Sequence, residues 1–343
     1  MVNRIFKVIL LFTPIAYCVG VHYYKFEVVF FQLTSMILII SSLFDTPKRE
    51  FKIKKILTLF LGICMLSVVL HGFQIKNLSA LINIFFGCID VYILAVYSKD
   101  LKKCINWLMV GLGINALIFI GQWFGYSPFI DPKTIHGSAG GIIPGEYGGI
   151  IGNAPRFAAF ITLVLPFISV WYLIPAIVLG FVLKEVGIII SVLIVFIAKT
   201  LIAYRNDEVG EGLCKFVLLF SLLSGAVLLY FYHTKILTSF SIRMNTWKTA
   251  LEHIAQRPFF GFGLGTFNIA DFGCSSFLQW IYGVGFLGLG FIVLCIKKIK
   301  WYLFPLLFLC LFEYPFEIPR LYPLLVFVIA YWAIEQKEER LWD

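Results

Sequence analysis

Residues 78–97 read LSALINIFFGCIDVYILAVY, an apolar run with a single charged side chain, Asp90. A helix of this length is about 30 Å long, which matches the hydrocarbon thickness of a bilayer. Similar runs recur along the chain, whose 343 residues are 60% hydrophobic and 14% charged. Because the bilayer core offers no water to backbone polar groups, such runs are expected to be helices. The sequence therefore predicts an all-α integral membrane protein.

The runs predict about twelve spans within a single polytopic membrane domain, residues 1–343. The spans are expected at 5–22, 26–44, 56–72, 78–97, 104–124, 156–172, 174–184, 187–203, 214–232, 277–296, 301–314 and 321–335. The seventh is short for a bilayer, so it requires tilting, local thinning or merging with its neighbours into a broken hairpin.

Basic residues separate the loops into two sets. Most of the 28 lysine and arginine residues fall in alternate short loops, including 48–55, 99–103 and 297–300. Short basic loops stay on the cytoplasmic side, so both termini are expected to be cytoplasmic. Topology thus accounts for the net charge of +9, and no nucleic-acid partner is expected. The first span lacks a cleavage motif and is expected to remain as an anchor.

Two outward segments are long enough to form a site. Residues 125–155 form a glycine-rich loop, whose composition favours tight turns over helix. Residues 233–276 are expected to be an outward loop with an amphipathic helix at 242–257, capped by Ser241 and ended by Pro258. Its expected apolar stripe recurs at helical spacing and comprises Met244, Trp247, Leu251 and Ile254. Such a helix would lie in the outer membrane interface.

Three alternating glycines follow this helix: Gly261, Gly263 and Gly265. Because they lack side chains, their backbone N–H groups are expected to approach an anion closely. Arg243 and Arg257 stand at the two ends of the helix and can bind phosphate through their planar guanidinium groups. An interfacial anchor without chemistry is the alternative interpretation.

Cysteines and metal ligands offer no competing site. Of the eight cysteines, Cys274 alone falls in an outward loop, so no disulfide framework is predicted. No cluster of histidine, cysteine and aspartate has metal-ligand spacing, so neither a metal nor another cofactor is expected.

Three stretches resemble the O-antigen ligase and O-antigen polymerase superfamily of bacterial inner-membrane proteins. Residues 243–267, RMNTWKTALEHIAQRPFFGFGLGTF, are similar to the family's arginine, tryptophan four residues on, and proline before G-x-G-x-G. Residues 274–291, CSSFLQWIYGVGFLGLGF, resemble its L-Q and G-x-x-G-L signature. Residues 149–166, GIIGNAPRFAAFITLVLP, resemble its G-x-x-G-N-P-N-x-x-A element. A bundle of twelve spans is also the family's architecture.

The resemblance implies a polyprenyl-diphosphate-dependent glycosyltransferase of cell-envelope polysaccharide biosynthesis. Its expected partners are an undecaprenyl-diphosphate-linked glycan, membrane lipid and other polysaccharide-assembly proteins. The site would face outward from the bacterial cytoplasmic membrane.

Departures from the family pattern favour polymerase over ligase. Ligases carry a histidine-asparagine pair where this chain has Cys274 and Ser275, and a serine-arginine pair where it has Lys184 and Glu185. The expected reaction transfers a glycan from polyprenyl diphosphate to a sugar hydroxyl of another lipid-linked unit. Transfer to a lipid or protein acceptor, as in a ligase, is the alternative.

This reaction requires cations for the departing diphosphate and a base for the incoming hydroxyl. Arg243 and Arg257 are the first candidates for the diphosphate, followed by Arg156, Lys184 and Arg320. Asp271 lies three residues before Cys274, near the place of the family's histidine, and is the first candidate for the base. Other candidates for the base are Glu146, Glu185, Glu317 and His253.

A polysaccharide flippase or transporter is the alternative from another class of protein. Many-span proteins that move substrates carry charges near the midplane and often contain internal repeats. Here the charges cluster at the ends of spans, with Asp90 and Asn83 as the main exceptions, and no repeat is evident. A non-catalytic membrane scaffold would explain the hydropathy and leave the three stretches unexplained.

Overall fold

The computed structural model describes residues 1–15, 23–51, 54–124, 154–182, 186–267, 275–296, 299–312 and 321–335. Within these ranges the regular structure is helical, and they contain no strand. An all-α architecture is therefore confirmed for the described part of the chain. The glycine-rich loop expected at 125–155 lies outside it, except for its last two residues, which begin a helix.

A helix lies at each of the twelve predicted spans. The helices are α1 (Val2–Phe12), α2 (Tyr23–Leu43), α3 (Lys54–His71), α4 (Ile75–Tyr97), α5 (Ile105–Trp123), α6 (Ala154–Val164), α7 (Leu173–Val182), α8 (Val186–Arg205), α9 (Glu211–Ile254), α11 (Ser276–Ile296), α12 (Phe304–Phe312) and α13 (Tyr322–Glu335).

Five of the described helices are long and apolar enough to cross a membrane. They cover Lys54–His71, Ile75–Tyr97, Leu101–Gly121, Gly187–Arg205 and Ser276–Leu294. Shorter apolar helices cover Val28–Leu43, Phe157–Phe167, Trp301–Leu311 and Tyr322–Glu335. These lengths and compositions indicate a membrane-embedded protein.

The main core forms around α13, which is buried along most of its length against α4, α1 and α6. Its Phe327 and Tyr331 rings contact Phe167 with centroid distances of 5.0 and 5.2 Å. Two polar contacts join α2 to α4: Gln32 Nε2 donates to Asn83 Oδ1 at 3.0 Å, and Ser35 Oγ donates to Asp90 Oδ2 at 2.6 Å. The two polar side chains that interrupt the apolar run of α4 are thus paired inside the bundle.

The span expected at 156–172 is interrupted. Helix α6 ends at Val164 and is followed by two short 3₁₀ turns, Leu165–Phe167 and Val170–Tyr172. Pro166 lies in the first turn, and proline can neither donate a backbone hydrogen bond nor fit an α-helix interior without a clash. Lys199 Nζ of α8 donates to the Ile168 carbonyl, which covers a backbone acceptor freed by the interruption.

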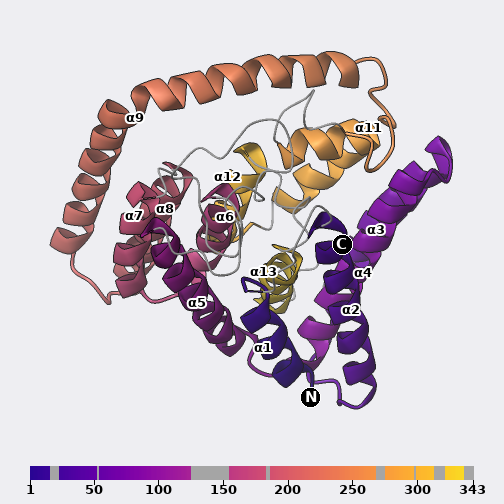
Figure 1. The fold of residues 1–343 in the computed structure, drawn as a ribbon, viewed down its shortest axis with the longest axis horizontal. Helices are drawn as coiled ribbons and strands as arrows, with labels where there is room; N and C mark the ends of the chain where they lie inside the picture. Colours follow the sequence, from indigo (N-terminus) through magenta and orange to yellow (C-terminus); the bar gives the residue numbers. More distant parts are fainter. Residues whose placement is uncertain are drawn as a thin grey trace.

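Helix α9 differs most from expectation. The predicted span at 214–232 and the amphipathic helix at 242–257 are one helix, Glu211–Ile254. Ser241 is therefore not a cap, and the segment from 233 to 241 is helical. This segment contains neither glycine nor proline, and extending an existing helix costs less than starting another. In Figure 1 α9 rises beside α8, changes direction and runs across the top of the molecule to α11.

Candidate functional site

The end of α9 leads into residues 257–265, the glycine turn, which docks into a break in α11. Helix α11 is interrupted at Gly285, whose backbone has φ 66° and ψ −153°. The turn supplies hydrogen bonds to the interrupted backbone. The Phe262 N–H donates to the Tyr282 carbonyl at 2.8 Å, and the Phe286 N–H donates to the Pro258 carbonyl at 2.7 Å. Irregular backbone at membrane depth is tolerated where protein groups satisfy it in this way.

Glycine is required where the two backbones meet. A Cβ atom at Gly285 would lie 2.5 Å from the Phe259 carbonyl carbon and oxygen, and one at Gly261 would lie 2.4 Å from the Tyr282 carbonyl oxygen. Both glycines also have positive φ angles. No other residue could occupy these positions without moving the backbone.

This packing corrects the role expected for the glycines. The Gly261 N–H donates to the Arg257 carbonyl at 3.0 Å, and the Gly263 N–H donates to the Gly283 carbonyl at 3.0 Å. These two groups bond within the protein instead of facing an anion. Gly265 approaches α4, since a Cβ atom there would lie 2.9 Å from the Lys76 carbonyl oxygen. The glycines therefore bring backbones together.

The side chains between the glycines anchor the turn in two clusters. Phe262 stacks on Tyr282 of α11, with ring centroids 4.6 Å apart, and both belong to a cluster that includes Ala250 and Ile254 of α9. Leu264 is buried in a second cluster between α3, α4 and α11. The turn is thus held by three helices as well as by α9.

His71, at the end of α3, is a site residue that sequence reasoning missed. Its Nδ1 lies 2.8 Å from the Ser67 carbonyl oxygen, and its Nε2 lies 3.0 Å from the Gly261 carbonyl oxygen. Nearby, Ser67 Oγ donates to the Gly283 carbonyl at 3.2 Å. His71 and Ser67 therefore tie α3 to the turn and to the break in α11. The sequence signal is a histidine at the end of an apolar run, and its partner Gly261 is 190 positions away.

A pocket of about 360 Å³ opens beside the glycine turn. It is lined by Leu70, His71, Arg257, Pro258, Phe259, Phe260 and Gly261. The Leu70, Phe259 and Phe260 side chains are about half exposed or more. The pocket thus combines a guanidinium and an imidazole with a wide apolar rim, a lining that suits an amphiphile with an anionic group.

Arg257 is exposed, and its Cζ lies 5.1 Å from the centroid of the Phe262 ring. This cation–π contact orients the guanidinium beside the pocket. Arg257 also lies just beyond the carboxyl end of α9, where a cation is favoured electrostatically. The two interpretations of Arg257, as an anion ligand and as a helix-end partner, are compatible.

Arg243 is half-buried and lies on the face of α9 that also carries Trp247, Ala250 and Ile254. This face is turned slightly from the expected stripe, because Met244 and Leu251 are about half exposed. Arg243 lies eleven positions before the end of α9, about 16 Å along the helix. The structure therefore does not bring the two arginines side by side.

The remaining candidates are not placed. Asp271, Lys184, Arg320 and Cys274 lie outside the described residues, as do Glu146, Glu185 and Glu317. Arg156 belongs to α6, but the structure does not describe its side chain.

Ser275, at a position where ligases keep a polar pair, has a structural role here. Its Oγ accepts a hydrogen bond from the Leu278 N–H at 3.4 Å, which caps the start of α11. The hydroxyl also donates to the Cys310 carbonyl at 3.3 Å.

The histidine on α9 packs against the turn: the His253 ring centroid lies 6.5 Å from that of Phe262. In the described part of the chain no three histidine, cysteine, aspartate or glutamate side chains are grouped to hold a metal ion. Comparison of the chain with protein-family models, with curated proteins and with solved structures finds no match.

Proposed function

We propose that the chain is a glycan polymerase of the outer face of the cytoplasmic membrane, which uses polyprenyl-diphosphate-linked repeat units. The observation that carries the proposal is the docking of the glycine turn into the broken helix α11 beside a pocket that contains Arg257. Residues 243–267 and 275–291, which belong to two of the stretches that resemble the polymerase and ligase superfamily, pack together as one unit. This contact between the two stretches supports the proposal.

The pocket fits the chemistry of a lipid diphosphate. In the transfer, a sugar hydroxyl attacks the anomeric carbon, the bond from that carbon to the diphosphate oxygen breaks, and the hydroxyl proton passes to a base. Negative charge grows on the departing diphosphate, and a guanidinium beside it stabilises that charge. The exposed rims of Leu70, Phe259 and Phe260 suit the first isoprene units of the carrier.

The spacing of the arginines assigns them different parts of the substrate. Arg257 lines the pocket and is the candidate ligand of the diphosphate. Arg243 lies on α9, about 16 Å before the helix end that leads to Arg257, so we assign it to the glycan that projects from the membrane. Asp271 stays the candidate base on sequence grounds.

The test is complementation of a deletion strain, read as a glycan ladder on a gel. The wild-type chain should restore long glycans, whereas Arg257→Ala should leave single repeat units at unchanged protein level. Arg257→Lys keeps the positive charge beyond the end of α9 but removes the planar guanidinium that can bind two phosphate oxygens. This variant therefore distinguishes a role in binding phosphate from a role in stabilising the end of the helix. Strong loss in Arg257→Lys supports the phosphate role.

Lys248→Ala is the matched control, because Lys248 is a largely exposed cation on α9, the helix that precedes Arg257. It should restore the full ladder. Full-length glycans in the Arg257→Ala strain would sink the assignment of this pocket. Long glycans that accumulate on the lipid carrier in the deletion strain would indicate a ligase, and repeat units trapped on the cytoplasmic leaflet would indicate a flippase.

A further inference from the structure

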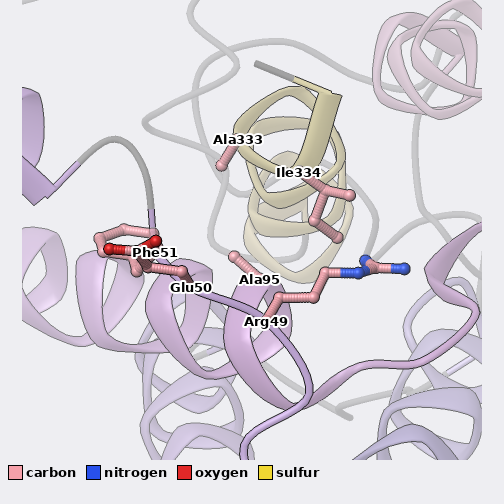
Figure 2. A pocket seen from close by; sticks show the side chains of 6 residues that line it. All are labelled: Arg49, Glu50, Phe51, Ala95, Ala333 and Ile334. Atoms are coloured by element: carbon pink, nitrogen blue, oxygen red, sulfur yellow. The ribbon is translucent and has the colours of Figure 1, made fainter. Parts of the chain in front are cut away.

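A second pocket, of about 350 Å³, lies far from the glycine turn in the sequence and in the bundle. It is formed by the loop between α2 and α3 and by the carboxyl-terminal ends of α4 and α13. Its lining residues are Arg49, Glu50, Phe51, Ala95, Ala333 and Ile334 (Figure 2). This end of the bundle is the one predicted to face the cytoplasm, and nothing in the proposed function uses it.

The loop is fixed to the end of α4 by its backbone and by Arg49. The Lys48 and Arg49 N–H groups both donate to the Val96 carbonyl, at 2.8 and 3.1 Å. Arg49 Nη2 donates to the Lys99 carbonyl at 2.9 Å. Phe51 packs edge-on against Tyr92 of α4, with ring centroids 5.0 Å apart. The loop is therefore held in place by α4, and the pocket is a built feature.

The pocket carries one charge of each sign. In Figure 2 the Arg49 guanidinium extends past Ile334, whereas the Glu50 carboxylate lies on the opposite side, next to Phe51. Both charged side chains belong to exposed residues. The ends of α4 and α13 add partial negative charge, because the last carbonyls of a helix point outward from its carboxyl terminus. A ligand for this pocket would place an anion at Arg49 and a cation at Glu50.

Between the charges the floor is apolar. Ala95 and Ala333 are almost fully buried, and Phe51 and Ile334 are half-buried beside them. The pocket lies at the ends of two apolar helices, α4 and α13, where a membrane span would meet the lipid headgroups. A ligand with an apolar part below and a polar part above fits this position.

We propose that this pocket binds the headgroup of a phospholipid that carries both a phosphate and a primary ammonium group, as in phosphatidylethanolamine. The guanidinium of Arg49 would bind the phosphate, the carboxylate of Glu50 would accept hydrogen bonds from the ammonium, and the acyl chains would continue along α4 and α13. A volume of about 350 Å³ is at the lower end of the range of about 300–1,000 Å³ for small-molecule sites.

Glu50 should distinguish phosphatidylethanolamine from phospholipids with other headgroups. A quaternary ammonium headgroup has no N–H to donate to Glu50, and a glycerol headgroup has no positive charge to offer it. A surface that carried only basic residues would instead prefer the anionic glycerol lipid, because such a surface binds lipids according to their net charge.

Native mass spectrometry of the full chain in detergent tests the proposal. The protein is titrated with an equimolar mixture of phosphatidylethanolamine, phosphatidylcholine and phosphatidylglycerol with identical acyl chains. The ethanolamine lipid should bind about tenfold more tightly than either competitor, the factor expected for one charge-assisted hydrogen bond. Glu50→Gln should reduce this preference to about threefold or less, whereas Glu211→Gln, which removes an exposed carboxylate at the start of α9, outside the pocket, should retain it.

Arg49→Gln should weaken binding of all three lipids, and Lys103→Ala should not, because Lys103 is an exposed cation outside the pocket. The folding of each variant is checked by size-exclusion chromatography. Preference for phosphatidylglycerol in the wild type, or an unchanged preference in Glu50→Gln, overturns the proposal. Complete displacement of the lipid by millimolar inorganic phosphate also overturns it, because the ligand would then be a free phosphate.

Discussion

Replacing Gly285 by alanine tests whether the glycine turn occupies the break in α11. With φ 66° and ψ −153°, Gly285 lies in a region of backbone space that is essentially restricted to glycine. Any other residue there costs roughly 1–3 kcal/mol of backbone strain. The added Cβ atom would also lie 2.5 Å from the Phe259 carbonyl carbon and oxygen and 2.7 Å from the Phe260 nitrogen, so the turn must move.

Moving the turn breaks the hydrogen bond from the Phe286 N–H to the Pro258 carbonyl. A buried donor left without a partner costs a further 1–3 kcal/mol, so the total for Gly285→Ala is about 2–6 kcal/mol. Gly290→Ala is the control, because Gly290 lies in the same helix with no atom within 4 Å of the added carbon. There alanine should gain up to about 1 kcal/mol from its higher helix propensity.

Thermal unfolding in detergent, followed by tryptophan fluorescence, compares the two variants with the wild type. Gly285→Ala should melt about 3–10 °C below Gly290→Ala, because 1 kcal/mol shifts the melting temperature of a chain of this length by roughly 1.4 °C. If both variants melt within about a degree of each other, the turn does not pack into the break and the geometry of the candidate site is wrong.

Three further outcomes are expected. His71→Ala should lower the melting temperature of the protein, and His71→Gln should restore part of it, because the amide can still donate to the Gly261 carbonyl. Trp280→Phe should cost about 1 kcal/mol, measured by the same melting assay, since Trp280 Nε1 donates to the Gly288 carbonyl at 3.0 Å. The hydrogen-bonded Lys103 ammonium lowers the pKa of Asp100. The ion pair should therefore be present at and above the ordinary aspartate pKa and be lost as the pH falls through the lowered pKa. A titration of the Asp100 carboxyl group followed by NMR measures this pKa, and a value at or above the ordinary one would contradict the ion pair.

The helices were predictable because apolar runs of span length leave few alternatives in a membrane protein. Even the short seventh run, at 174–184, proved to be a separate helix, α7, packed against α8. The continuity of α9 was harder to predict, because the polar residues between 233 and 241 resemble a loop in composition while containing nothing that stops a helix. Polar side chains indicate that a segment contacts water, but they do not end a helix; glycine and proline do so through their effect on the backbone.

The site was only half predictable. Its glycines and Arg257 could be identified from local sequence, since glycine spacing and charge are visible within a few residues. The partner of those glycines is the break at Gly285, and His71 reaches the same turn from α3. These contacts depend on which helices pack together, which no local pattern contains, so the glycine spacing predicts an anion site where the structure has a neighbouring backbone.

The break in α11 also constrains how the protein enters the membrane during synthesis. Alone in lipid, the backbone groups exposed at Gly285 would each cost several kcal/mol, so a newly inserted α11 should first be an unbroken helix. Its partners, α3 and the glycine turn, are earlier in the chain and have already left the ribosome. Helix α11 should therefore open at Gly285 only on meeting them, which makes this docking a late step of assembly inside the bilayer.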